Sequence, residues 1–167
     1  FSKDTINVIY KKLHDLNIPI ILDPVMIAKS GDKLLKDDAA NELMKKLIPI
    51  SSLLTPNLPE ASRILSCNPA KNISEMKDQG KALCDFGAKA VLIKGGHQSG
   101  ENCDDILVLN SGKSFHFSAK RKFTKNTHGT GCSYSSAITA LVAKGNGICD
   151  AVEIAHNWLQ GAINFSD

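Results

Sequence analysis

Three short apolar segments, separated by longer amphipathic segments, constrain the fold of this chain more than any other feature. They lie at residues 19–22, 53–54 and 90–93, and each leads directly into polar residues. Short apolar runs bounded in this way are typical of buried strands, whereas the apolar residues between them recur at helical spacing. Strands that alternate with helices predict an α/β fold, with a mostly parallel sheet covered by helices on both faces.

The remaining elements follow from the same patterns and from the residues that start and stop helices. Residues 105–110 and 114–119, joined by Ser111-Gly112-Lys113, predict a hairpin. The predicted helices cover residues 3–16, a segment from Asp37 or Asp38 to the residue before Pro49, a short segment after Asn57, residues 74–86 with Ser74 as the cap, a segment from about Ser133 to Gly145, and a segment that begins at Asp150. No repeat or linker interrupts them, so we expect residues 1–167 to form a single domain.

Composition excludes several classes of function. The chain has 167 residues, a net charge of +3 and 43% hydrophobic residues, which is typical of an ordinary soluble globular protein and too weakly basic to indicate nucleic acid. The cluster Lys120-Arg121-Lys122 is better explained as a solvated edge strand. No apolar run reaches the length of a membrane span. The five cysteines lack a Cys-x-x-Cys pair, which predicts reduced thiols in the cytoplasm. Because the first residue is Phe1, we expect a processed or partial chain.

Polar side chains follow each predicted strand of the sheet. Asp23 follows the first strand, Asn57 and Glu60 follow the second, and Lys94 follows the third. Because ligands bind outside the carboxyl ends of strands in open α/β sheets, we expect these side chains to meet at one edge.

Each of these side chains also has a plainer interpretation. Asp23 is equally compatible with a turn before Pro24. The spacing of Asn57 and Glu60 favours a helix cap with an acid in the first turn, and a Mg²⁺ site is the alternative. A lysine at a strand end is usually just exposed, although Lys94 could also reach a bound phosphate as a point charge. His97 and Cys103 are more simply loop residues than a metal pair.

A glycine-rich stretch precedes the most apolar of the predicted helices. It comprises Asn126, Thr127, His128, Gly129, Thr130, Gly131 and Cys132. The first amides of a helix have no partner within it, so together with the helix dipole they form a binding site for anions, most often phosphate. The same dipole favours the thiolate form of Cys132. The stretch therefore predicts an anion site with a proton-accepting group at its end, which suits phosphoryl transfer.

Four segments in register resemble the ribokinase-like superfamily, and within it the hydroxymethylpyrimidine/phosphomethylpyrimidine kinases. They are Leu22-Asp23-Pro24-Val25-Met26 with Ala28-Lys29-Ser30-Gly31, Thr55-Pro56-Asn57-Leu58-Pro59-Glu60-Ala61, Leu92-Ile93-Lys94-Gly95-Gly96-His97, and Lys125-Asn126-Thr127-His128-Gly129-Thr130-Gly131-Cys132. The resemblance implies ATP-dependent phosphorylation of hydroxymethylpyrimidine and then of its monophosphate, in thiamine biosynthesis.

The resemblance also implies roles for individual residues. Cys132 resembles the base for the substrate hydroxyl, and Lys94 a clamp on the transferred phosphate. The family's anion hole corresponds to Gly129, Thr130, Gly131 and Cys132. Its nucleotide contacts correspond to Lys94, Thr127 and Asn57. Its magnesium region corresponds to Asn57, Glu60 and Asp23. Together they make a phosphotransferase that binds ATP, Mg²⁺ and a pyrimidine.

One departure from the family is large, because its N-terminal part, with much of the pyrimidine pocket, is absent. The chain therefore corresponds to the nucleotide-binding and catalytic half of a ribokinase-like domain. We expect the full-length parent to be a homo-oligomer and this part alone to be inactive. Pyridoxal kinase of the same superfamily is the closest alternative, and a non-catalytic nucleotide-binding fragment is the alternative of another class.

Overall fold

A computed structural model describes residues 2–26, 34–96, 100–122, 124 and 128–166. Its helices and strands, in chain order, are α1 (Lys3–Leu13), β1 (Ile21–Leu22), α2 (Asp37–Glu42), the π-helix η1 (Leu43–Leu47), β2 (Leu53–Leu54), α3 (Leu58–Leu65), α4 (Ile73–Asp85), β3 (Ala90–Ile93), β4 (Asn102–Leu109), β5 (Ser114–Lys120), α5 (Thr130–Ala143) and α6 (Ile148–Asn164). Among the described residues, no helix has both the length and the apolar character needed to cross a membrane.

The five strands form one sheet in the order β1-β2-β3-β4-β5. The pairs β1–β2 and β2–β3 are parallel, whereas β3–β4 and β4–β5 are antiparallel. The prediction of a mostly parallel sheet is therefore wrong, and the sheet is mixed. The reason is the hairpin, which was predicted correctly but joins the sheet through β4, beside β3, and contributes both antiparallel pairs.

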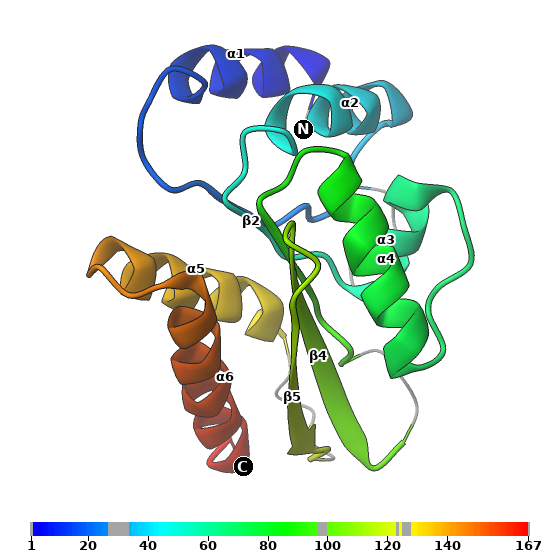
Figure 1. The fold of residues 1–167 in the computed structure, drawn as a ribbon, viewed down its shortest axis with the longest axis vertical. Coiled ribbons are helices and arrows are strands. Elements are labelled where there is room, and N and C mark those ends of the chain that lie inside the picture. The colour runs from blue at the N-terminus through cyan, green and yellow to red at the C-terminus, as the bar shows by residue number, and fades with distance from the viewer. Residues whose placement is uncertain (1, 27–33, 97–99, 123, 125–127, 167) are drawn as a thin grey trace.

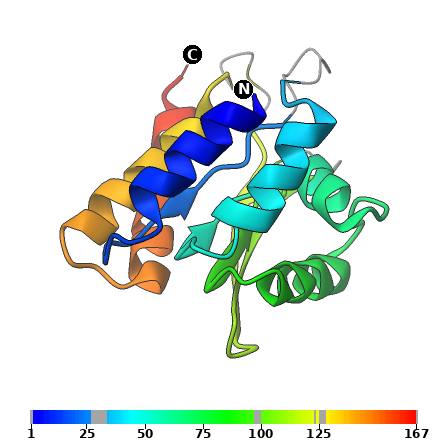
Figure 2. The same ribbon diagram turned by 90° about the horizontal axis from the view of Figure 1, so that it is seen from above.

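Helices cover both faces of the sheet, as predicted. Figure 1 shows α5 and α6 on one side of β4 and β5, with α3 and α4 on the other, and Figure 2 shows the same separation from above. The period of two in β3 divides the core accordingly. Val91 and Ile93 pack in the core under α1 to α4, whereas Ala90 and Leu92 pack in the core under α5 and α6.

Several helix ends differ from the prediction for local reasons. The cap of α4 is Asn72, whose side chain accepts a hydrogen bond from the Glu75 amide at 2.9 Å, so Ser74 lies inside the first turn. The start of α5 is Thr130, three residues earlier than predicted, because Gly129 takes a left-handed conformation (φ 77°) and lets the helix begin at once. Likewise α6 begins at Ile148 and α1 ends at Leu13.

Candidate active site

The carboxyl ends of β1, β2 and β3 bring three polar segments together. The backbone after β3 continues beside the segment after β2, since the Lys94 amide donates to the Pro56 carbonyl at 2.9 Å and Asn57 bridges to Lys94. The Lys94 ammonium donates to Asp23 Oδ1 at 2.9 Å. Only 12% of the Lys94 side chain and 17% of the Asp23 side chain are exposed, so this ion pair is largely shielded from solvent.

The first turn of α5 reaches the same place. A Cβ atom added to Gly131 would lie 3.4 Å from Lys94 Nζ. A glycine at this position leaves the ammonium in direct reach of the helix N-terminus, where an anion would meet both. Cys132, the next residue, is exposed.

A chain of hydroxyl groups connects Asp23 with α5. Asp23 Oδ1 accepts from the Thr55 hydroxyl at 3.3 Å, and Thr55 Oγ1 lies 3.0 Å from Ser135 Oγ. Ser135 Oγ also lies 3.1 Å from the Gly131 carbonyl, and because each hydroxyl has a single hydrogen, two of these three contacts are hydrogen bonds at any one time. Thr55 and Ser135 are buried, so these contacts hold the strand end and the helix start at a fixed separation. Neither residue was expected in the site from the sequence.

Asn57 and Glu60 form a capping box at the start of α3. Asn57 Oδ1 accepts from the Glu60 amide at 2.9 Å, and Glu60 Oε2 accepts from the Asn57 amide at 2.8 Å. The plainer interpretation of this spacing, a helix cap, is therefore the one that the structure contains. Glu60 Oε1 also lies 3.4 Å from the Met26 amide, which ties the capping box to the segment after β1.

Glu60 is a buried carboxylate close enough to the Lys94 ammonium for their charges to interact. Burial raises its pKa, and the Asn57 amide and the positive charge of Lys94 oppose that rise. Only 2% of the residue is exposed. A buried carboxylate that is only partly neutralised attracts a further cation.

These donors fit Mg²⁺ only as partial ligands. Within the residues that the structure describes, no three His, Cys, Asp or Glu side chains are grouped closely enough to hold a metal ion. Mg²⁺ is usually held by one or two carboxylates together with waters and substrate phosphates. Asp23 and Glu60, whose charges act on each other, meet that smaller requirement.

Several predicted features lie outside the described residues, namely the segment Ala28-Lys29-Ser30-Gly31, His97, and Lys125, Asn126 and Thr127. The prediction that Cys103 is a loop residue is wrong, because it lies half-buried in β4, where burial raises the pKa of its thiol. Gly129 and Thr130 lie at the start of α5, where Gly129 has no side chain with which to cap the helix.

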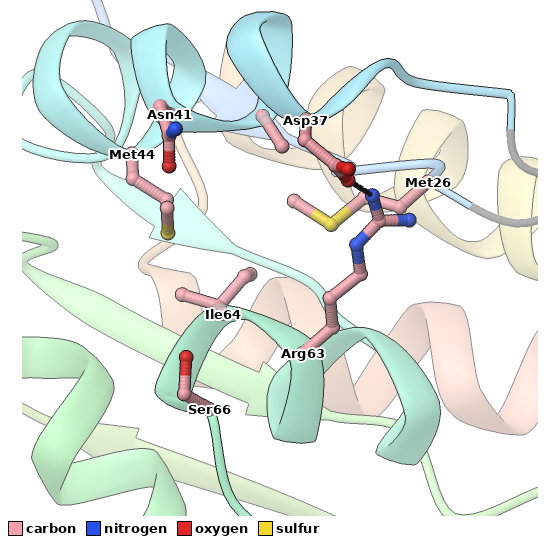
Figure 3. A pocket seen from close by; sticks show the side chains of 8 residues that line it. Met26, Asp37, Asn41, Met44, Arg63, Ile64 and Ser66 are labelled. Carbon is pink, nitrogen blue, oxygen red and sulfur yellow. Dashed lines mark hydrogen bonds and ion pairs between the residues drawn. The ribbon is translucent and has the colours of Figure 1, made fainter.

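A cavity of about 220 Å³ lies away from these groups, between α2, η1 and α3. Figure 3 shows Met44, Ile64 and Met26 around it, with the Arg63–Asp37 ion pair (2.8 Å) at its side. Its lining contains neither Lys94 nor Gly131. We place the candidate active site at the strand ends, because the charged groups and the helix N-terminus meet there.

Comparison with known proteins identifies the family. The sequence model described as phosphomethylpyrimidine kinase matches residues 1–167. The hydroxymethylpyrimidine/phosphomethylpyrimidine kinase of Escherichia coli (strain K12) is 42% identical over 165 residues, which are 98% of this chain and 62% of that protein.

Solved structures agree with this result. The phosphomethylpyrimidine kinase of Clostridium difficile 630 has a TM-score of 0.81 and 38% identity, over 97% of this chain and 65% of that one. The ADP complex of Bacillus subtilis pyridoxal kinase has a TM-score of 0.87 and 28% identity, over 98% and 60%. The chain thus spans less than two thirds of each of these relatives. It belongs to the phosphomethylpyrimidine kinase family.

Proposed function

We propose that the protein containing this chain transfers the γ-phosphate of ATP to hydroxymethylpyrimidine and then to its monophosphate, in thiamine biosynthesis. The observation that carries the proposal is the position of the Lys94 ammonium, which lies against Gly131 at the start of α5 while it pairs with Asp23. The sequence identity of 42% to the Escherichia coli kinase supports the choice of substrate.

The proposed chemistry depends mainly on charge and alignment. Phosphoryl transfer through a loose transition state needs neutralisation of the equatorial oxygens and an in-line nucleophile, and little covalent chemistry. Lys94 and the amides of residues 129–132 supply positive charge at one point. Asp23 holds the ammonium in place before the nucleotide arrives, so little reorganisation is needed. Cys132, exposed in the first turn of α5, accepts the proton of the substrate hydroxyl.

Magnesium and the nucleotide contacts complete the proposal. Glu60 and Asp23 would hold Mg²⁺ through its waters, with Asn57 fixing the orientation of Glu60. Bound Mg²⁺ would neutralise charge on the nucleotide phosphates. Thr127 is proposed as a nucleotide contact from the family resemblance alone. We also propose a homo-oligomeric parent in the cytoplasm, which sedimentation of the purified protein and cell fractionation would test.

Pyridoxal kinase activity is the second candidate, and one observation favours it. The TM-score of 0.87 with the Bacillus subtilis pyridoxal kinase exceeds the value of 0.81 with the Clostridium difficile pyrimidine kinase. Sequence identity points the other way, at 28% against 38%. We give identity more weight, because side chains rather than backbone shape recognise a substrate.

The test compares substrates and variants in one assay. The full-length parent and residues 1–167 are each assayed with ATP and Mg²⁺ against hydroxymethylpyrimidine, its phosphate and pyridoxal. We expect the parent to use both pyrimidines, and turnover of pyridoxal alone would select the second candidate. Cys132→Ala should lower kcat by about 10²–10⁴-fold with little change in nucleotide affinity. Cys67→Ala, at the other exposed cysteine, is the control. Absence of turnover by the parent on all three compounds would refute kinase activity on either substrate class.

A further inference from the structure

A buried aspartate and a buried histidine lie next to the turn formed by Lys94, Gly95 and Gly96, which is called the Lys94 turn below. Asp105, in β4, and His156, in α6, are 7% and 4% exposed. Asp105 Oδ1 accepts a hydrogen bond from the Gly95 amide at 2.9 Å, and Oδ2 lies 3.4 Å from His156 Nδ1. Where Asp105 accepts in this contact, the hydrogen lies on His156 Nδ1.

The backbone of the turn is held at two successive amides. The Lys94 amide donates to the Pro56 carbonyl and the Gly95 amide to Asp105. The turn also lies very close to β4, because a Cβ atom on Gly95 would be 1.9 Å from the Asp104 carbonyl oxygen. The backbone from which the Lys94 side chain extends therefore has its direction set partly by Asp105.

His156 extends the same contact toward α5. Its ring lies 5.8 Å from that of Phe117 and 6.2 Å from that of Tyr134, measured between centroids. Tyr134 is two residues after Cys132 in the same helix. The Asp105–His156 pair thus contacts the lysine turn on one side and, at Tyr134, the helix whose first turn belongs to the candidate site on the other.

Such a pair is costly as a purely structural device. Removing a carboxylate from water costs free energy that its contacts only partly return, and apolar residues of similar size often stabilise a core as well. A backbone amide fixed by an ionised oxygen, however, gains a stronger and more directional bond than a neutral acceptor provides.

We propose that Asp105 is a positioning residue for phosphoryl transfer, which acts through the Gly95 amide on the placement of the Lys94 ammonium, and that His156 orients Asp105. The proposal rests on the proposed kinase function. Neither residue is assigned contact with the substrate.

The test uses the full-length enzyme and a neighbouring control. Asp105→Ala should lower kcat by about tenfold or more, with the KM of the pyrimidine unchanged. The reason is that a displaced Lys94 ammonium weakens mainly the stabilisation of the transition state. Asp105→Asn should restore most of kcat, since its carbonyl oxygen can accept from Gly95. Asp104→Ala is the control, because the Asp104 side chain pairs with His116 at 2.9 Å and not with the turn. In ¹⁵N–¹H spectra, the Gly95 amide proton should move upfield in Asp105→Ala and stay unchanged in Asp104→Ala.

The outcomes separate this proposal from the kinase function itself. An active wild type combined with a folded Asp105→Ala variant of normal kcat would overturn the positioning role alone. An inactive wild type would refute the kinase function and this inference with it. If Asp105→Ala does not fold, His156→Phe decides, since it keeps the ring packing but removes the Nδ1 donor. A lowered kcat in that variant supports the proposal, and a normal kcat refutes it.

Discussion

The Lys94 ammonium has two neighbours with opposite effects on a bound phosphate. Asp23, at 2.9 Å, holds it but competes for its charge, whereas the amides near Gly131 add to its attraction for an anion. An ammonium has three donors, so it can keep Asp23 and still donate to a phosphate oxygen. The ion pair with Asp23 therefore leaves the ammonium able to bind the nucleotide phosphate in the proposed site.

The cysteines offer a direct test of where the nucleotide binds. Burial, with a smaller contribution from Asp85, raises the pKa of Cys84 to about 11. Burial also raises the pKa values of Cys103 and Cys149, whereas Cys67 and Cys132 are exposed. Because the thiolate is the reactive form, a thiol reagent at pH 8 should modify the two exposed cysteines first.

Adding ATP and Mg²⁺ should then slow the modification of Cys132 and leave that of Cys67 unchanged. Mass spectrometry of digested protein would measure both rates in one sample. Equal rates at Cys132 with and without nucleotide would contradict a phosphate site at the start of α5.

Two adjacent glycines should differ sharply in their tolerance of a methyl group. A Cβ on Gly95 would lie 1.9 Å from the Asp104 carbonyl oxygen, whereas a Cβ on Gly96 would meet no atom of the described residues within 4 Å. Gly95→Ala should therefore lower the free energy of unfolding by about 1–3 kcal/mol or more, as overpacking does. Gly96→Ala should change it by less than about 0.5 kcal/mol. Urea denaturation measures both, and similar losses in the two variants would disprove the close approach of the turn to β4.

Among the elements, α3 and α4 begin with the same kind of cap and so provide a matched comparison. Asn57 caps α3 and Asn72 caps α4, each by accepting from an amide three residues later at 2.9 Å. Replacing either by alanine should cost about 1 kcal/mol of stability. Only Asn57→Ala should also weaken the binding of ATP with Mg²⁺, because only that cap orients a carboxylate near Lys94. Calorimetric titration would measure the affinity of each variant for ATP with Mg²⁺. Equal affinities would mean that Asn57 acts only as a helix cap.

Sequence patterns predicted the helices and strands themselves better than the helix caps and the order in which the strands pair. The bounds of β2 and β3 were predicted correctly, because a short apolar run between polar residues has few alternatives. The cap of α4 was predicted wrongly as Ser74, because Asn72, two residues earlier, is equally suited to a cap and only the backbone geometry shows which of them takes that position. The mixed sheet was missed because a hairpin predicts its own pairing and not the strand beside which it lies.

The same distinction holds in the candidate site. The meeting of Asp23 with Lys94 follows from a general rule about strand ends, so sequence alone could predict it. The contacts of Thr55 with Ser135 and of Asp105 with His156 join residues 80 and 51 positions apart. No periodicity connects such pairs, and their polar side chains carry no local signal of burial. These two pairs can be recognised only from the three-dimensional structure, in which the helices and the sheet are packed together.

At the scale of the whole molecule, β3 is shared by both cores, which makes the two layers mutually dependent. Leu92 and Ile93 are both fully buried, but Leu92 packs under α5 and α6 and Ile93 under the helices α1 to α4. Since one strand carries both side chains, neither layer can lose its packing without disturbing the other. We expect the chain to unfold in a single transition.

Alanine at either position tests this dependence. Leu92→Ala and Ile93→Ala should each lower the free energy of unfolding by about 2–5 kcal/mol. The single tryptophan, Trp158 in α6, reports on one layer by fluorescence, while far-UV circular dichroism reports on helices of both. If the layers depend on each other, the two signals should change at the same urea concentration even in Ile93→Ala, whose cavity lies in the layer without the tryptophan. Fluorescence that persists after most of the helical signal is lost would mean that α5 and α6 remain packed alone. The turn that carries Lys94 would then lie between two separately stable layers.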